Sequence, residues 1–221
     1  MIVAIDGPAG SGKSTIARII AEKLGFVYLD TGAMYRALTL KTIMEGIENT
    51  DEKNVIRLAE SLDFNFNENS RVFLDGKDVT EEIRTPQIVR AISPICKIPA
   101  VREALVFLQR KIAGRQDIVT EGRDTTTVVF PGAELKVFLI ASVEERAKRR
   151  LNDFKAKGIE ITLDAVKDDI EKRDHADYSR DAGPLKKAED AYELDTTGLT
   201  IEQVVDKILG RLGDGTTISL R

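Results

Sequence analysis

Residues 7 to 14 combine glycine, lysine and serine at the spacing of a phosphate-binding loop. They read GPAGSGKS, which matches GxxxxGK followed by serine or threonine. Glycines let backbone N–H groups turn toward an anion, and the positive end of a following helix adds to the attraction. We expect Lys13 to neutralise charge between the outer phosphates and the Ser14 hydroxyl to be one ligand of Mg²⁺. The motif therefore predicts binding of a nucleoside triphosphate. The residues predicted to contact it are Gly7, Pro8, Ala9, Gly10, Ser11, Gly12, Lys13, Ser14 and Thr15.

Several arginines are candidates for binding further anionic groups. Some lie where predicted strands end, at the edge of an open α/β sheet where ligands bind, and others lie in a charged segment. A single arginine is more often a solvated surface charge, but their shared placement around one crevice favours an anion site. A phosphate-binding loop alone does not separate switches, motors and kinases, but the chain lacks the Asn-Lys-x-Asp motif of guanine-specific switches and the LSGGQ segment of transport ATPases. The candidates are Arg36, Arg102, Arg123, Arg173 and Arg180.

The elements that position these residues follow a βα rhythm. An apolar run at 2–5 precedes the glycine-rich loop, and a helical period then ends at Gly25. The unit recurs as a strand at 26–29, an Asp-Thr-Gly loop at 30–32 and a helix that ends at Gly46. Further strands are predicted at 118–120, 135–140 and 192–194. The pattern predicts an α/β fold, a three-layer sandwich around a five-stranded parallel sheet.

Two segments interrupt this rhythm. Between 47 and 100 the βα pattern is lost, and 64–79 alternate with period two around Asp75-Gly76, a type I′ hairpin signal. A helix is predicted at 99–113, with Pro99 at its first position and Gly114 at its end. The second segment, 153–182, is rich in charge and predicts a mobile, solvated lid.

Two helices of the core carry capping boxes, Ser142 with Glu145 and Thr200 with Gln203. The second of these helices has one apolar stripe, which suits packing on a sheet. The stripe consists of Ile201, Val204, Val205, Ile208 and Leu212.

Composition narrows the class of function. The 221 residues carry 33 Lys+Arg and 37 Asp+Glu, a net charge of −4, so no global field favours nucleic acid or an anionic membrane. The single cysteine, Cys96, cannot form an internal disulfide, which fits a reducing compartment. The first residues lack a signal-peptide pattern, and the longest later apolar run, 137–141, is too short for a membrane span. We expect a monomeric cytoplasmic protein without a nucleic-acid or membrane partner.

Seven blocks, in matching order, make the chain resemble bacterial cytidylate kinases, nucleoside monophosphate kinases of the P-loop class. The resemblance runs from about residue 2 to residue 210. The blocks are IDGPAGSGKST at 5–15, LDTGAMYRALTL at 29–40, EEIRTP at 81–86, IPAVREAL at 98–105, EGRD at 121–124, TVVFPGAELKVFL at 127–139 and LDTTGLTIEQVV at 194–205.

The resemblance implies transfer of the ATP γ-phosphoryl group to CMP or dCMP, with Mg²⁺ as cofactor, and a division of the chain into three parts. The first part is a core with the P-loop, the second an inserted NMP-binding subdomain with a small antiparallel sheet, and the third a helical lid. The implied boundaries are 1–36, 116–152 and 183–212 for the core, 37–115 for the insertion, 153–182 for the lid and 213–221 for a flexible tail.

The resemblance also implies which residues bind the acceptor. Arg36 and Arg123 should hold its phosphate, with Thr31 and Tyr35 lining the pocket. Cytosine offers an amino donor beside two acceptors, so it needs a carboxylate or hydroxyl next to an arginine. The residues that we expect to read the base are Ser93, Arg102 and Asp124, although Ser93 could instead be a turn residue before Pro94 and Asp124 could merely cap a loop.

The lid pattern is matched by Arg173, Asp177 and Arg180, and it implies that arginines close over the phosphates while the aspartate approaches the sugar. Lys13 and the arginines at 123, 173 and 180 are thus the expected catalytic residues. Arg146 and Arg150 lie one turn apart on the helix before the lid, and they suit either contact with ATP or a solvated helix face.

The chain departs from the family pattern at two places. Thr125 and Thr126 stand where an apolar residue and glycine are usual, so the resemblance does not predict the backbone conformation near the cytosine pocket. In the lid, Ala176 replaces an arginine and Gly183 an alanine, which predicts weaker closure; the only histidine, His175, is expected to be exposed and incidental. Two alternatives therefore stay open: a kinase for another small acceptor such as UMP, and a catalytically weak nucleotide-binding module.

Overall fold

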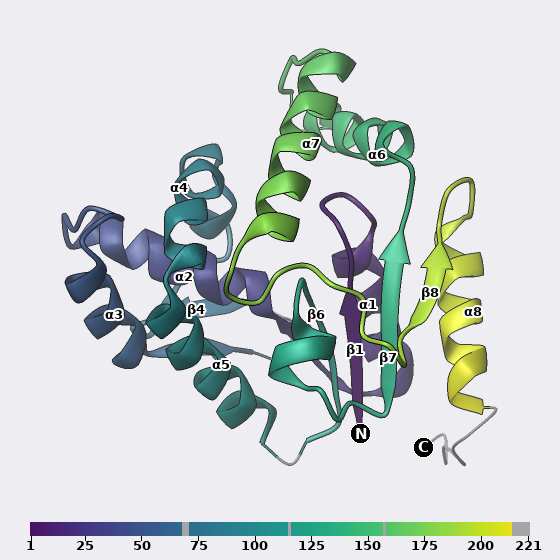
Figure 1. Cartoon of the computed structure of the whole chain (residues 1–221), viewed down its shortest axis with the longest axis horizontal. Coiled ribbons are helices and arrows are strands. Elements are labelled where there is room, and N and C mark those ends of the chain that lie inside the picture. Colours follow the sequence, from purple (N-terminus) through teal and green to yellow (C-terminus); the bar gives the residue numbers. More distant parts are fainter. Residues whose placement is uncertain (68–70, 115, 157, 214–221) are drawn as a thin grey trace. The chain divides into compact units, whose positions relative to one another are not determined.

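The structure is a computed structural model that describes residues 1–67, 71–114, 116–156 and 158–213. It has two compact units. The first comprises Met1–Phe26 together with the described residues from Ile118 onward, and the second comprises Val27–Asp117 (Figure 1). Most of the predicted flexible tail, residues 214–221, lies outside the described residues. Within the described ranges, no helix is long and apolar enough to cross a membrane.

The main sheet has five strands, as predicted, and the structure gives their order as β2-β6-β1-β7-β8. The first unit contributes β1 (Ile2–Asp6), β6 (Ile118–Gly122), β7 (Leu135–Ile140) and β8 (Tyr192–Asp195), and the pairs among these four strands are parallel. The register sets Asp6 beside Gly122. Because parallel strands end at one edge, the loops that leave β1 and β6 begin side by side.

Helices of the first unit bury the apolar stripes that the sequence predicts. Helix α1 (Lys13–Leu24) buries Ile16 and Ile20 and ends at Gly25, whose φ is 68°. Helix α8 (Ile201–Gly213) begins with the complete capping box, because Thr200 and Gln203 exchange hydrogen bonds between side chain and backbone. Its first predicted core residue, Ile201, is instead exposed.

The predicted lid segment belongs to a helical hairpin with an apolar core of its own. Helix α6 (Val143–Ala156) packs against α7 (Leu163–Ser179) through Ala147, Val166 and Ile170, which are fully buried. The expectation of a solvated segment is therefore wrong for this face of α7. Ser142 caps α6 by accepting the Glu145 N–H at 3.2 Å, but the Glu145 carboxylate pairs with Arg149, so only half of the predicted box forms.

The second unit contains β2 of the main sheet and the elements that follow it, which include the predicted insertion at 37–115. In chain order they are β2 (Val27–Asp30), α2 (Thr31–Met44), α3 (Glu52–Glu60), β3 (Phe64–Phe66), β4 (Val72–Leu74), β5 (Lys77–Asp78), the short 3-10 helix η1 (Glu82–Arg84), α4 (Pro86–Lys97) and α5 (Pro99–Ala113). The last helix has the predicted limits. Strands β3, β4 and β5 form the small antiparallel sheet.

Two local features of this unit test the turn predictions. Asp75 and Gly76 both have positive φ, 49° and 74°, as a type I′ turn between β4 and β5 requires. The predicted loop at 30–32 is absent, because Asp30 ends β2 and directly caps α2 by accepting the Ala33 N–H at 2.8 Å.

Candidate functional site

The loop at 7–14 leaves β1 and opens α1, as predicted, and its glycines have separate structural reasons. Gly10 and Gly12 have φ of 76° and 93°, and Gly12 is the N-cap of α1. At Gly7, where φ is 153°, an added Cβ would lie 2.1 Å from the carbonyl oxygen of Leu139 in the neighbouring strand β7. The first glycine of the motif is therefore required by the close approach of the sheet.

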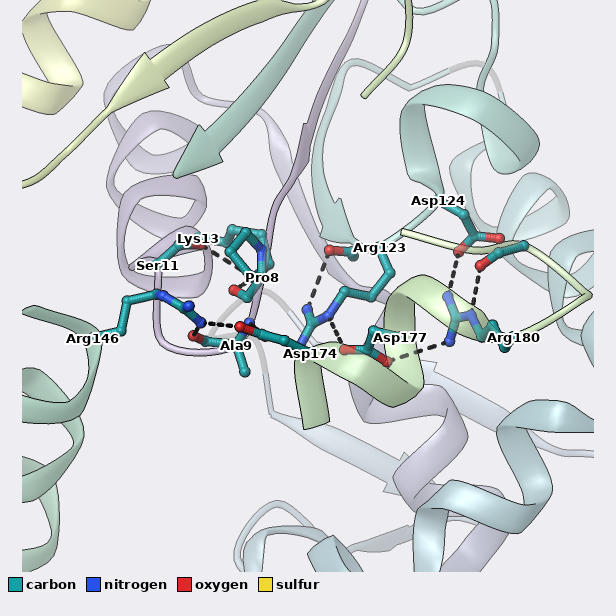
Figure 2. A network of polar contacts seen from close by, with 12 residues as sticks. Pro8, Ala9, Ser11, Lys13, Arg123, Asp124, Arg146, Asp174, Asp177 and Arg180 are labelled. Atoms are coloured by element: carbon teal, nitrogen blue, oxygen red, sulfur yellow. Dashed lines mark hydrogen bonds and ion pairs between the residues drawn. The ribbon is translucent and has the colours of Figure 1, made fainter. Parts of the chain in front are cut away.

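Lys13 is buried within this loop. Its Nζ donates to the Pro8 carbonyl at 2.8 Å and lies 3.4 Å from the Ser11 hydroxyl (Figure 2). Burial lowers the pKa of Lys13 to about 7, and the positive charge of Arg123 adds to that effect. An anion in the loop would favour the ammonium form and reverse the shift.

Ser14 has a partner that the sequence analysis missed. Its Oγ donates to Oε1 of Glu121 at 2.7 Å, and Glu121 is buried near the end of β6. A hydroxyl and a carboxylate oxygen are ligand types that Mg²⁺ prefers. Among the described residues no group of three or more His, Cys, Asp or Glu side chains gathers as a metal site, so a magnesium ion here would need oxygens from the nucleotide and from water.

Four of the expected acceptor residues form a chain of alternating charge in the first unit (Figure 2). Arg123 donates from Nε to Asp177 at 2.6 Å, and a guanidinium nitrogen of Arg180 lies 3.7 Å from the other Asp177 oxygen. Arg180 also lies 3.7 Å from Asp124 and donates to the Gly183 carbonyl. Burial raises the pKa of Asp177, but the hydrogen bond from Arg123 and the positive charges of Arg123, Arg173 and Arg180 together hold that pKa below its ordinary value.

Arg146 lies against the phosphate-binding loop. It donates to the Ala9 carbonyl at 2.8 Å and to Asp174 of α7 at 2.6 Å, and the same carboxylate accepts the Ala9 N–H at 3.1 Å (Figure 2). Arg146 is 4% exposed, so its interpretation as part of a solvated helix face is wrong. A carboxylate of the helical hairpin thus accepts a hydrogen bond from an N–H group of the phosphate-binding loop.

The remaining basic residues of the hairpin lie in different places. Arg150 pairs with Asp169 at 3.2 Å and stacks over Phe154, within the hairpin itself. Arg149, which the sequence analysis passed over, donates to the Thr196 carbonyl at 2.8 Å. Arg173 lies on α7 one turn before Asp177, and its positive charge lowers the pKa of Lys13.

The second unit positions the other expected acceptor residues, chiefly on α2 and α5. Arg36 donates to Asp30 at 2.9 Å, and its buried Nε has no hydrogen-bond partner among the described residues. The guanidinium of Arg102 lies 5.6 Å from the Tyr35 ring centroid, a cation–π distance. Thr31 is buried at the first turn of α2. Ser93 is exposed inside α4, so its interpretation as a turn residue is wrong.

Comparison with known proteins agrees with the sequence resemblance. A model of the cytidylate kinase family matches residues 3–213. A cytidylate kinase of Alkaliphilus oremlandii is 52% identical over 210 residues, which cover 95% of this chain and 96% of that protein. A cytidylate kinase of Lactobacillus johnsonii is 50% identical over 211 residues, covering 94% of this chain and 92% of the other. An uncharacterized protein of Eubacterium ventriosum, known from a crystal structure, shares the fold at a TM-score of 0.53 and 15% identity, covering 97% and 98% of the two chains.

Proposed function

The chain belongs to the cytidylate kinase family, and we propose that it transfers the γ-phosphoryl group of ATP to CMP or dCMP. An oxygen of the acceptor phosphate attacks the γ-phosphorus, the bond to the β-phosphate oxygen breaks, and CDP or dCDP and ADP leave. The observation that carries the proposal is the gathering of buried cations at the loop, where Lys13 donates to the Pro8 carbonyl and Arg146 donates to the Ala9 carbonyl.

That gathering suits a reaction between two anions. ATP and a nucleoside monophosphate repel each other, so the protein must supply positive charge fixed in advance. In the structure, the carboxylates of Asp174 and Asp177 accept hydrogen bonds from Arg146 and Arg123. We infer that substrate phosphates take over these donors, with Lys13 and the loop N–H groups on ATP and with Arg123 on the acceptor.

The remaining acceptor roles follow the same chemistry. Arg36, whose guanidinium is only partly engaged by Asp30, would hold the acceptor phosphate together with Arg123. Asp124 and Arg102 would read the donor and acceptors of cytosine. Uracil would place an oxygen opposite the Asp124 carboxylate, and a polar site of this kind rejects the wrong base by up to roughly 10⁴-fold.

Catalysis would consist of positioning and charge stabilisation. Phosphoryl transfer passes through a loose transition state, so no dedicated base is needed. Arg173 and Arg180, both carried by α7 or its end, would stabilise the migrating group and help exclude water. Mg²⁺ would be held by the Ser14 hydroxyl and the neighbouring Glu121 carboxylate, and when bound it neutralises charge on the outer phosphates. The proposal extends to a monomer acting in the cytoplasm.

ADP release, measured by a coupled assay over a panel of acceptors, tests this proposal. We expect turnover with CMP and dCMP, little with UMP or AMP, and very little without an acceptor. Equal or better turnover with UMP would contradict the base-reading roles of Asp124 and Arg102. ATP binding without any stimulation by CMP would favour the nucleotide-binding module instead.

A further inference from the structure

A buried carboxylate links the phosphate-binding loop to the residue pair Arg123-Asp124. Asp6 is the last residue of β1, directly before Gly7, and its side chain has no exposed surface. A charged group in the interior of a sheet is tolerated only when its hydrogen-bonding capacity is satisfied. Burial raises the pKa of the Asp6 carboxyl, and hydrogen bonds from Thr126 and Thr125 act against that rise.

Both threonines offer two donors each to this carboxylate. Oδ1 of Asp6 accepts the Thr125 N–H at 3.0 Å and the Thr125 hydroxyl at 2.7 Å. Oδ2 accepts the Thr126 N–H and the Thr126 hydroxyl, each at 2.7 Å. The two threonines are themselves at most 1% exposed. The carboxylate is therefore held by four donors from two consecutive residues, which follow Asp6 by 119 and 120 positions in the sequence.

The threonines also begin an unusual turn. Residues Thr125–Val129 form a single π-helical turn, in which the N–H of Phe130 donates to the carbonyl of Thr125, five residues before it, at 2.8 Å. Two consecutive N–H groups that converge on one carboxylate fix the orientation of the peptide planes before them. Those planes join Asp124 to Thr125 and Thr125 to Thr126. The hydrogen bonds to Asp6 therefore set the direction in which the side chains of Asp124 and its neighbour Arg123 extend from the backbone.

We propose that Asp6, Thr125 and Thr126 form a positioning cluster for phosphoryl transfer. The cluster ties the loop that carries Arg123 and Asp124 to the strand that delivers the ATP-binding loop. It rests on the proposed function, because it matters only if Arg123 and Asp124 act on the acceptor. Asp6 touches no substrate in this scheme. The hydroxyls at 125 and 126, which replace an apolar residue and glycine, make the anchor stronger than two N–H groups alone would.

A purely structural role would predict a loss of stability alone, so the test separates turnover from folding. The double variant Thr125→Val/Thr126→Val removes both hydroxyls while keeping a β-branched shape, and Thr125→Ser/Thr126→Ser keeps the hydroxyls. Thr42→Val is the matched control, because Thr42 is a fully buried threonine whose hydroxyl bonds to the Thr39 carbonyl in the second unit. Each variant is assayed for kcat and for KM of CMP at saturating ATP, for the Kd of ATP and for Tm.

We expect the valine double variant to lose about tenfold or more in kcat, or to raise KM for CMP by as much, since misplacement of a reacting group by ~1 Å can cost 10²-fold. Its Kd for ATP should stay within about twofold, the serine variant should keep most of the turnover, and Thr42→Val should lower Tm without changing kcat. If the valine double variant does not fold, Thr125→Val alone must show the same direction of change.

Three results decide between the possibilities. If the wild-type protein is active and the folded valine double variant has the same kcat and KM, the positioning role of the cluster is refuted. A serine variant as impaired as the valine variant would refute it too, because the hydroxyls would then not be the reason. A wild-type protein without CMP-stimulated turnover would instead refute the proposed function, and the same assay shows this before any variant is compared.

Discussion

ATP binding should weaken as the pH rises above 7, because Lys13 loses its proton in the free protein. Its pKa is lowered to about 7, first by burial and then by the charges of Arg123 and Arg173. A bound triphosphate brings the opposite charge to Nζ and should return the pKa toward the ordinary value of 10.5. Binding then takes up a proton, and the proton uptake grows with pH.

The magnitude follows from the protonated fraction. With a pKa of about 7, roughly half of the Lys13 side chains are charged at pH 7 and about a tenth at pH 8. The apparent affinity should therefore fall about fivefold from pH 7 to pH 8 and about tenfold per unit beyond, or ~1.4 kcal/mol per unit.

Titration calorimetry with a non-hydrolysable ATP analogue checks both effects. Binding is measured between pH 7.5 and 8.5, in two buffers of different ionisation enthalpy, so that proton uptake is read from the difference in heat. Close to one proton should be taken up at pH 8 by the wild-type protein and none by Lys13→Arg, because arginine stays charged. A pH-independent Kd without proton uptake would show that Lys13 is already charged in the free protein and that burial does not dominate its pKa.

Four further predictions follow from Lys13 and from other contacts described above. The pKa of Lys13 in the folded protein lies below its ordinary value of 10.5, so between pH 7 and 10.5 the unfolded chain binds more protons than the folded one. The free energy of unfolding should therefore rise with pH over this range. Urea titrations should show a smaller rise for Lys13→Met, which has no ammonium group. Arg123→Ala should cut kcat by about 10³-fold or more with little change in the Kd of ATP, and a large loss of ATP affinity would place Arg123 in the donor site. Asp174→Ala should tighten ATP binding by roughly fivefold, because no side-chain acceptor then competes for the Ala9 N–H; weaker binding in calorimetry would contradict this. Thr200→Ala should lower the free energy of unfolding by about 1 kcal/mol while Thr200→Ser does not, as urea denaturation can show.

The fold is predictable from sequence wherever its signals are local. The helix at 99–113 is bounded by proline and glycine, whose backbone limits act on the residues next to them. The turn at Asp75-Gly76 requires positive φ at both positions, which few residue pairs tolerate. Local patterning was less informative in α7, because its charged residues obscured the two buried positions Val166 and Ile170.

The site is less predictable, because its contacts join residues far apart in the chain. Ser14 meets Glu121 across 107 positions, and no periodicity connects the two. The charge pattern of its own helix leaves Arg146 either in contact with ATP or on a solvated face, whereas its position depends on the packing of α6 beside the loop that contains Ala9. A carboxylate at the end of a buried strand next to the loop strand is the one signal that could have identified Glu121.

Gly7 shows that a conspicuous motif residue can be a poor reporter of ligand contact. In Gly7→Ala the new methyl group would meet the Leu139 carbonyl, so β1 and β7 would have to separate. Loss of activity in that variant would therefore reflect distortion of the sheet and would not report on nucleotide affinity. At Gly12 a methyl group would approach only the end of the Arg149 side chain, at 3.7 Å, but the φ of 93° would strain any other residue there, so this substitution too would disturb the loop itself.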